Sequence, residues 1–375
     1  MRLLINTATT FKGGGVQVAS SFIDELRHFK EHEYHIILGQ GIAQIIDTDN
    51  YPDFKFYKIP YRPAQRVFSL RDQGAFLKQV EEEVKPDCVF TTSGPAYWRP
   101  KAPHLMGFNL PHYLYPDSPF FRTIGLAGRL KWFLKGQIIK YYTSRDADAY
   151  VVQTDDVKER LKKWINKQDV YTVTNTYGDQ YNTMGADTPS VLPVKQSGEF
   201  RLLMLSSYYA HKNFEIINDI ISQYNEYERE NIKFVLTLPQ DTFESIFSSE
   251  MRKYIYNVGP VKPSECPQLY KDCDAVFLPT LLECFSATYA EAMKMGLPII
   301  TTDLGFAHTV CGKAALYFKP LDAADAKNKI ILLYADGGLR KALTDAGEDE
   351  MKKFNSSRER AARFLELSLN LIKKQ

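Results

Sequence analysis

Residues 278–298 read LPTLLECFSATYAEAMKMGLP, and the fold class can be inferred from this run. Its apolar start has the composition of a buried strand, which Pro279 ends, and the short loop after it carries Glu283. A helix is expected next, because Gly296 with Pro298 soon after it forms a helix stop signal. A buried strand, a short loop and a helix that leads into another strand form the unit from which parallel α/β sheets are built.

The same alternation of apolar runs and helical periodicity extends along most of the chain. The expected strands are residues 3–6, 34–38, 54–59, 88–91, 104–108, 149–153, 170–173, 201–206, 233–238, 255–258, 275–278, 298–301 and 315–318. Helical patterns between them include residues 18–29, 75–84, 213–227, 265–271 and 285–295. Continuous Val/Ile/Leu strands that alternate with helices indicate parallel sheets covered on both faces, so we predict doubly wound α/β domains.

The periodicity weakens at residues 177–198, which are rich in Gly, Pro, Asn, Asp, Ser and Thr. This composition is typical of a linker. We therefore predict a first domain of residues 1–180 and a second of residues 181–355, followed by a helical segment at residues 356–375.

The composition sets limits on class and partners. The chain has 375 residues, 44% hydrophobic and 25% charged, which is typical of a soluble globular protein. Its net charge of +2 gives no case for nucleic acid as a partner. No apolar run is long enough to span a membrane, the N-terminus reads as a buried strand rather than a secretory signal, and the five cysteines are scattered. A cytoplasmic location is predicted.

Two glutamates flank the start of the helix in residues 278–298. Ligands of open α/β sheets bind at the carboxyl ends of strands, and the loop with Glu283 lies at such an end. The helix N-terminus offers free N–H groups and a positive dipole end, which suit a diphosphate. One of Glu283 and Glu291 could then face a sugar and the other a ribose across a bound nucleotide. The alternative is two solvated glutamates beside an ordinary helix.

The frame Pro-Thr-x-x-Glu-Cys-Phe-x-x-x-x-x-Glu-Ala-Met-x-x-Gly-x-Pro at residues 279–298 resembles the signature of retaining GT-B glycosyltransferases, the large "group 1" family. The resemblance continues in residues 256–261, 269–276 and 314–320, and in residues 150–175 of the first half. It covers nearly the whole chain and is thin between residues 30 and 100. It implies two Rossmann-like domains that face each other across a cleft, and a C-terminal helix that crosses back onto the first domain.

The resemblance also implies roles for residues of the second domain. Glu291 should hold the ribose hydroxyls and Glu283 should contact the donor sugar. Lys212 should lie against the donor diphosphate, where the family usually has an arginine about five residues earlier and this chain has Ser207. The remaining donor contacts are expected from backbone near the glycine turn and the helix start, namely Val258, Gly259, Phe285, Ser286 and Ala287.

Two loops of the first domain are expected near the donor sugar. Gly13, Gly14 and Gly15 fail the dinucleotide fingerprint, because the third glycine position is Val18 and the second strand ends without an acidic residue. A tight turn is the alternative; the resemblance implies instead that these glycines let the backbone approach the donor's phosphate and sugar. His112 follows the strand 104–108, and the resemblance places a histidine near the sugar, whereas a structural role is the alternative.

No metal site is predicted. Three Asp-x-Asp triplets could suggest one. Asp146/Asp148 and Asp272/Asp274 precede buried strands, and Asp47/Asp49 lies in a loop. No His/Cys cluster has metal-ligand spacing. His308 stands where the family commonly has a glutamate, with no effect assigned.

Residues 120–145 hold six basic residues and no acidic one. Leu126, Leu130, Phe133, Leu134, Ile138 and Tyr141 recur there at helical spacing. One interpretation is a peripheral surface for anionic lipid or a lipid-linked acceptor at the inner face of a membrane. The favoured alternative is an ordinary amphipathic helix whose apolar side lies in the core.

The sequence therefore predicts a retaining glycosyltransferase that moves a sugar, expected to be a hexose, from a nucleotide diphosphate sugar to a glycan or lipid-linked glycan, without metal or cofactor. In the family the leaving phosphate is described as accepting the acceptor's proton. The alternatives are a nucleotide-sugar epimerase of the same fold and an inactive sugar-binding module. An NAD oxidoreductase is disfavoured by the missing acidic residue after the second strand.

Overall fold

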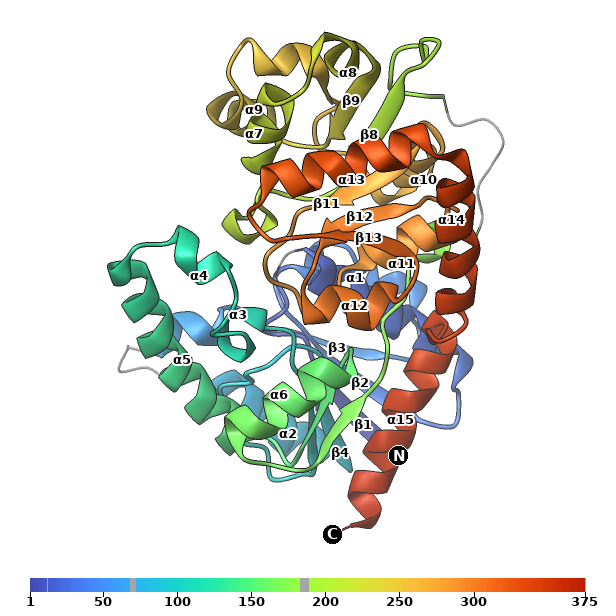
Figure 1. Ribbon diagram of the computed structural model, residues 1–375. Helices are drawn as coiled ribbons and strands as arrows, with labels where there is room; N and C mark the ends of the chain where they lie inside the picture. The colour runs from blue at the N-terminus through green and yellow to red at the C-terminus, as the bar shows by residue number, and fades with distance from the viewer. Residues whose placement is uncertain (12, 68–71, 183–188, 375) are drawn as a thin grey trace. The chain divides into compact units, whose positions relative to one another are not determined.

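The computed structural model describes residues 1–11, 13–67, 72–182 and 189–374 (Figure 1). They form two compact units. The first contains residues 1–116, 125–175 and 355–375, and the second contains residues 117–124 and 176–354. The chain thus passes between the units at 175/176 and 354/355 as well as around residues 117–124, whereas the sequence placed the boundary at residue 180.

Each unit is built on a parallel sheet. The first has the strand order β3-β2-β1-β4-β5-β6-β7 and the second the order β10-β9-β8-β11-β12-β13. The strands of the first are β1 (Arg2–Asn6), β2 (Glu33–Leu38), β3 (Lys55–Lys58), β4 (Cys88–Thr91), β5 (His104–Gly107), β6 (Ala149–Val152) and β7 (Val170–Thr172). Those of the second are β8 (Phe200–Met204), β9 (Ile232–Leu236), β10 (Ile255–Asn257), β11 (Ala275–Leu278), β12 (Ile299–Thr302) and β13 (Ala315–Phe318). Every predicted strand is found within two residues of its expected place.

Helices connect the strands. Those of residues 1–116, 125–175 and 355–375 are α1 (Gly14–Glu25), α2 (Ala75–Val84), α3 (Pro111–Leu114), α5 (Leu126–Asp146), α6 (Asp155–Ile165) and α15 (Ser357–Lys373). Those of the second unit are α4 (Phe120–Thr123), α7 (Ile216–Ser222), α8 (Glu226–Asn231), α9 (Gln240–Ile246), α10 (Cys266–Lys271), α11 (Ala287–Lys294), α12 (Gly305–Cys311), α13 (Ala323–Ala335) and α14 (Gly337–Met351). The predicted helix 213–227 is interrupted, because Asn225 and Glu228 form a capping box that starts α8.

Alternate residues of β1 show how the first sheet is covered on both faces. Leu3 and Ile5 belong to the core cluster that includes residues of α1 and α15, whereas Leu4 packs with residues of α2 on the opposite face. The rings of Phe22, Phe90 and Phe364 lie within 5.3 Å of one another and join α1, β4 and α15. The C-terminal helix is therefore part of the core of the first unit (Figure 1).

The second sheet is also buried on both faces. Leu202, Met204, Phe277 and Ile300 belong to one core cluster with residues of α7 and α13. Leu203, next to Leu202 in β8, is fully buried on the other face. This double burial is what the continuous apolar strands predict.

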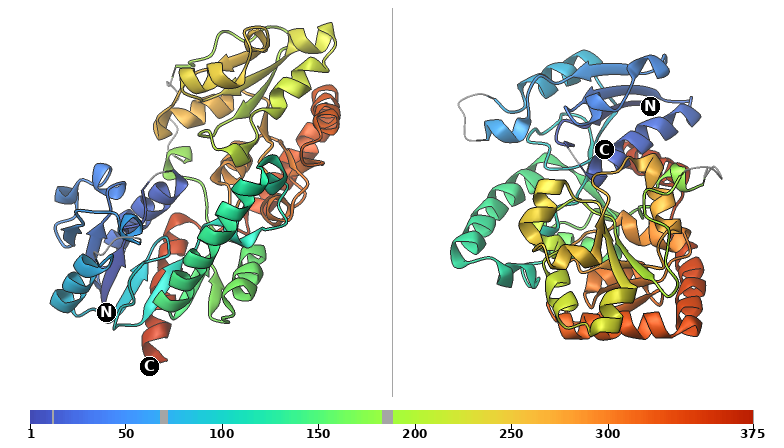
Figure 2. Two further views of the ribbon diagram at one scale, coloured as in Figure 1. Left: turned by 90° about the vertical axis from the view of Figure 1, so that its left-hand side faces the viewer. Right: turned by 90° about the horizontal axis from the view of Figure 1, so that it is seen from above.

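Helix α5 differs from the favoured expectation. Its apolar residues Leu126, Leu130, Phe133, Leu134 and Tyr141 are 55–81% exposed, so the interpretation that they lie in the core is wrong. The helix instead buries Gly136, Ile139, Thr143 and Asp146. Small residues permit this, because a Cβ at Gly136 would lie only 3.3 Å from the Tyr113 ring. In the left panel of Figure 2, α5 runs across the front of the first unit.

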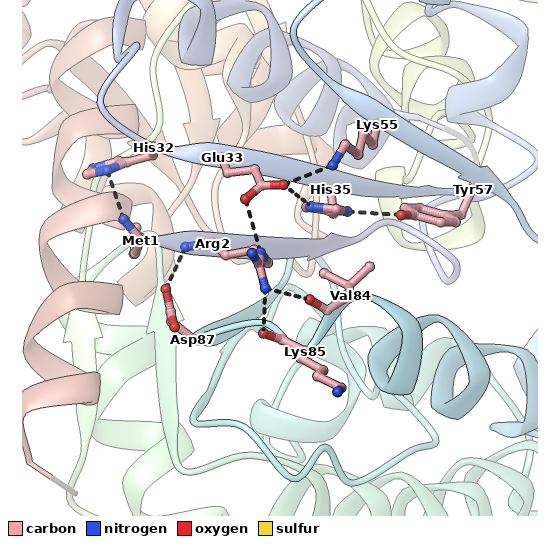
Figure 3. A network of polar contacts seen from close by, with 10 residues as sticks. All are labelled: Met1, Arg2, His32, Glu33, His35, Lys55, Tyr57, Val84, Lys85 and Asp87. Atoms are coloured by element: carbon pink, nitrogen blue, oxygen red, sulfur yellow. Dashed lines mark hydrogen bonds and ion pairs between the residues drawn. The ribbon is translucent and has the colours of Figure 1, made fainter.

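The amino-terminal ends of β1 and β2 carry a polar network (Figure 3). The Glu33 carboxylate accepts hydrogen bonds from Lys55 and Arg2, each at 3.0 Å, and lies 3.0 Å from the His35 ring. The Arg2 backbone N–H donates to Asp87 at 2.6 Å. Hydrogen bonds from Lys55, Arg2 and His35 hold the pKa of Glu33 at about 2, well below its ordinary value.

Glu33→Gln should therefore make folding less sensitive to acid. A carboxyl group with a depressed pKa in the folded state contributes stability above its ordinary pKa near 4.5 and loses it as the pH falls toward 2. The stability difference between wild type and variant should be largest at neutral pH and shrink across that window, as measured by thermal unfolding. Glu83→Gln, at an exposed position of α2, is the control. A difference that stays constant from pH 7 to 2.5 would contradict this role.

Candidate active site

The loop between β11 and α11 is tied to the loop that follows β8. The backbone N–H of Leu281 donates to the His211 carbonyl at 2.7 Å. The Thr280 hydroxyl is fully buried and lies 3.1 Å from a Glu283 carboxylate oxygen and 3.3 Å from the same carbonyl. Because β8 and β11 are neighbours in a parallel sheet, both loops leave its carboxyl edge, where α/β sheets bind ligands.

An ion pair joins these two loops. The Lys212 ammonium, at the end of a 3₁₀ turn over Ala210–Lys212, donates to the Glu283 carboxylate. Both side chains are only 12% exposed. The two residues that the sequence assigns to the diphosphate and the sugar are therefore in direct contact. An anion that binds Lys212 must compete with Glu283 for the ammonium.

His211 lies next to this pair and carries no charge at neutral pH. Burial, and secondarily the charge of Lys212, lower the pKa of its ring to about 3. The ring stacks on Tyr209 with 5.6 Å between centroids and meets Phe120 edge-on at 6.2 Å. The positive charge of this loop is thus that of Lys212, as expected from Ser207 in place of an arginine.

The N-terminus of α11 opens onto the same edge of the sheet. Within the described chain, the side chain of its N-cap residue Ser286 makes no capping hydrogen bond. The first-turn N–H groups thus keep the capacity to bind an anion. Phe285 and Ala287 are half-buried beside it, and the Phe285 ring packs against Phe354 at 5.9 Å.

Glu291 lies within α11, beyond its N-terminus, and is buried. It is 8% exposed, and the fully buried Tyr270 of α10 donates its hydroxyl to Oε2 at 2.7 Å. Burial raises the pKa of Glu291 above its ordinary value, and hydrogen bonds from Tyr270 and Tyr181 offset only part of this rise. The interpretation of Glu291 as a solvated surface residue therefore does not describe it.

The glycine turn follows β10 at the edge of the second sheet. Val258 continues the ladder, with its N–H donating to Leu236 at 3.0 Å, and Gly259 adopts a φ of 76°. A left-handed φ of this kind favours glycine. Asn257 pins the neighbouring loop through hydrogen bonds with the backbone of Leu238 at 3.0 and 2.9 Å.

In the first unit, the glycine-rich loop meets the loop after β5. Gly13 is the N-cap of α1 with a φ of 73°, Gly14 begins the helix, and a Cβ at Gly15 would lie 3.5 Å from the Asn109 amide. Ser93, after β4, donates its hydroxyl to the Asn109 side chain at 2.7 Å. Loops after β1, β4 and β5 therefore gather at one edge of this sheet. Lys12 lies outside the described residues.

His112 is at the same edge, in the short helix α3. Its ring stacks on Trp132 of α5 at 4.2 Å with an interplanar angle of 8°. His308, in the second unit, stacks on Tyr317 at 3.8 Å and lies 2.6 Å from Asp303. Its ring is 48% exposed.

Comparisons with known proteins find a match for the segment that contains Lys212 and Glu283. Residues 199–336 match the family model described as glycosyl transferases group 1. The match covers less than half of the chain and lies within the second unit. The predicted resemblance and the prediction of a glycosyltransferase are both confirmed. A comparison with curated proteins gives no match.

Solved structures extend the GT-B glycosyltransferase fold to the whole chain. Sucrose-phosphate synthase from Thermosynechococcus elongatus aligns with a TM-score of 0.71 and 13% identity over 100% of both chains. Anabaena HepE, in complex with UDP and glucose, aligns with a TM-score of 0.70 and 13% identity over 98% of this chain and 99% of its own. WaaG, a glycosyltransferase involved in lipopolysaccharide biosynthesis, aligns with a TM-score of 0.69 and 13% identity over 98% and 99%. The predicted GT-B fold is confirmed.

Sequence reasoning missed several residues of this glycosyltransferase. Thr280, Tyr270 and Tyr181 contact the predicted glutamates, but single Thr and Tyr residues carry no spacing signal. Among the described residues, no three His, Cys, Asp or Glu side chains gather as a metal site, and the metal-free mechanism stays a prediction. No helix in that part of the chain is long and apolar enough to cross a membrane.

Lys212→Met should destabilise the second unit by about 3 kcal/mol, because it leaves the Glu283 carboxylate largely buried without its cation. Much of this loss should return in the double variant with Glu283→Gln, where neither charge remains. Denaturant unfolding of the four proteins measures the coupling. Lys341→Met is the matched control, because its pair with Asp345 is exposed and screened by solvent, so its loss should change stability little. If Lys212→Met were as stable as Lys341→Met, a structural role for the buried Lys212–Glu283 pair would be refuted.

Proposed function

We propose that the chain transfers a sugar from a nucleotide diphosphate sugar to a glycan or lipid-linked glycan, with retention of anomeric configuration and without a metal. One observation carries this proposal. Lys212, Glu283 and the N-terminus of α11 gather at the carboxyl ends of two adjacent strands, inside the segment that matches the glycosyltransferase family. A cation and free N–H groups at such an edge suit a diphosphate.

The donor side of the reaction follows from this arrangement. The diphosphate takes Lys212 away from Glu283 and binds the amides near Phe285, Ser286 and Ala287. Glu283 is then free to accept hydrogen bonds from sugar hydroxyls. Glu291 holds the ribose, and the turn at Val258 and Gly259 lies next to the base. Because His211 stays neutral, Lys212 supplies the charge that stabilises the leaving diphosphate.

The chemical step needs no base from the protein. The acceptor hydroxyl oxygen bonds to the anomeric carbon on the face from which the diphosphate departs, and the bond from that carbon to the phosphate oxygen breaks. The hydroxyl proton moves to a phosphate oxygen of the leaving group. Gly13, Gly14, Gly15 and His112 are proposed to contribute contacts to the sugar and acceptor from the first unit.

Two alternatives make different products. An epimerase would convert the donor into its epimer without an acceptor, and an inactive sugar-binding module would leave it intact. The structure of HepE is described as a complex with UDP and glucose, so UDP-sugars are the first donors to test, followed by GDP-sugars.

The activity test measures release of nucleoside diphosphate from UDP- and GDP-hexoses with mixed glycan acceptors in EDTA. We expect release from one donor class, unchanged by the chelator, and a product with the donor's anomeric configuration by NMR. Activity that requires added Mn²⁺ or Mg²⁺, an inverted product, or an epimer would each contradict the proposal. A single-turnover measurement distinguishes a metal that assists product release from a metal that is needed for the chemical step.

Lys212→Met should lower kcat by about 10²–10³-fold with a smaller change in KM, because charge grows on the diphosphate as the glycosidic bond breaks. Lys341→Met, on an exposed surface, is the control for loss of one lysine charge. A raised KM with unchanged kcat would mean that Lys212 contributes only uniform binding.

We further propose that α5 contacts an anionic membrane surface, as a lipid-linked acceptor would require. Its exposed residues Leu126, Leu130, Phe133, Leu134 and Tyr141 share one side of the helix. Basic residues lie on both flanks of that side, and the segment 120–145 has no acidic residue. An apolar stripe bordered by cations matches the acyl boundary and charged headgroups of an anionic bilayer.

Co-sedimentation with vesicles tests this contact. Binding should require anionic phosphatidylglycerol in phosphatidylcholine vesicles and weaken with salt. Leu130→Ser with Phe133→Ser should reduce it by at least about tenfold, because each side chain loses its burial in the bilayer. Val194→Ser with Tyr227→Ser removes two exposed apolar side chains from the second unit as the control. Equal binding of both double variants, or equal binding to neutral vesicles, would rule out α5 as the contact.

A further inference from the structure

The surroundings of Glu291 are more specific than a buried glutamate needs. Tyr270, in α10, is fully buried and its hydroxyl lies 2.7 Å from Oε2. Tyr181, in the 3₁₀ turn Asp179–Tyr181, is 3% exposed, and its ring meets that of Tyr270 edge-on at 5.7 Å. The Tyr181 side chain also hydrogen-bonds Glu291, so two tyrosines from separate segments converge on one carboxylate.

The other titratable groups of this cluster are neutral, so Glu291 is the one member that can carry a charge near pH 7. The titratable groups that face it are Tyr270 and Cys266 from α10 and Tyr181 from the turn. Burial raises the pKa of the Cys266 thiol to about 12 and raises the pKa of both tyrosines. All three are neutral near pH 7, so the hydroxyls act as hydrogen-bond donors to the carboxylate.

We propose that Tyr270 and Tyr181 are positioning residues for nucleotide recognition, whose hydroxyls fix the orientation of the Glu291 carboxylate and leave its other lone pairs for the ribose hydroxyls. A carboxylate offers about four acceptor sites, so two tyrosine donors leave room for both ribose hydroxyls. The inference rests on the proposed ribose role of Glu291.

Tyr181 also connects this cluster to the place where the chain enters the second unit. It lies shortly after the boundary at 175/176, in the segment through which the chain enters the second unit. Phe354, the last residue before the chain leaves that unit, packs against Phe285 in the loop before α11. Both of these passages of the chain are therefore in contact with the helix region that is proposed to hold the donor.

The predicted effect of losing a tyrosine hydroxyl follows from the protonation of Glu291. Without one donor, the carboxylate is less favoured over the protonated acid, and the pKa of Glu291 rises further. The ionised fraction then falls at a given pH. Nucleotide binding should be weakened most at low pH and recover as the pH rises above the new pKa.

Calorimetric titration of UDP and GDP from pH 5 to 8 tests this inference on the full chain. Tyr270→Phe and Tyr181→Phe should each weaken binding about tenfold at the acid end, as loss of a hydrogen bond to a charged group implies, and shift the acid limb to higher pH. In turnover, the variants should raise KM with little change in kcat.

Tyr289→Phe is the matched control. Its hydroxyl is as buried and bonds Thr301 at 2.8 Å, from the same helix as Glu291. It should lose stability without shifting the acid limb. Circular dichroism confirms that each variant is folded. If Tyr270→Phe behaves like Tyr289→Phe, or if Tyr181→Phe binds nucleotide more tightly than wild type, the positioning role is wrong.

Glu291→Gln separates this inference from the function on which it rests. Wild-type nucleotide affinity in Glu291→Gln would overturn the ribose role itself. Weakened binding in Glu291→Gln, together with an unshifted acid limb in the tyrosine variants, would overturn only the inference. In the Glu291→Gln background, Tyr270→Phe should cause no further pH-dependent loss, because no carboxylate remains to titrate.

Discussion

Parallel pairing of the strands determines where the loops of both sheets lie. Every strand pair of the described residues is parallel, so all the loops that follow strands leave one edge of each sheet. That edge brings together segments that are far apart in sequence, such as the loops with Lys212 and Glu283. Burial of both sheet faces by helices leaves the strand ends as the places where polar side chains can gather.

Electrostatics within the second unit follow from this gathering. The Lys212–Glu283 pair and the Glu291 carboxylate are both shielded from solvent, yet they are satisfied in different ways. Lys212 has a charged partner that an anion can replace, whereas Glu291 is held by neutral hydroxyls that leave acceptor sites open. The first arrangement suits an exchange of partners, and the second suits a fixed contact.

The sequence predicts the strands well because each is a continuous apolar run bounded by clear turn signals. It also predicts which residues follow the strands, since Glu283 and Lys212 are read directly from their places after β11 and β8. It cannot predict their pairing, which depends on strand order in space. Tyr181 and Tyr270 are invisible for the same reason. For α5, periodicity shows that apolar residues share a side but not whether that side faces the core. The side with Gly136 faces the core instead, close to the Tyr113 ring.

In the proposed reaction, the donor diphosphate replaces Glu283 as the partner of Lys212. A crystal structure of the chain with bound UDP or GDP tests this most directly. We expect the Lys212 ammonium to lie within hydrogen-bond distance of a phosphate oxygen and no longer to contact Glu283, with the ribose hydroxyls on Glu291. A nucleotide bound elsewhere, with the Lys212–Glu283 pair intact, would contradict it.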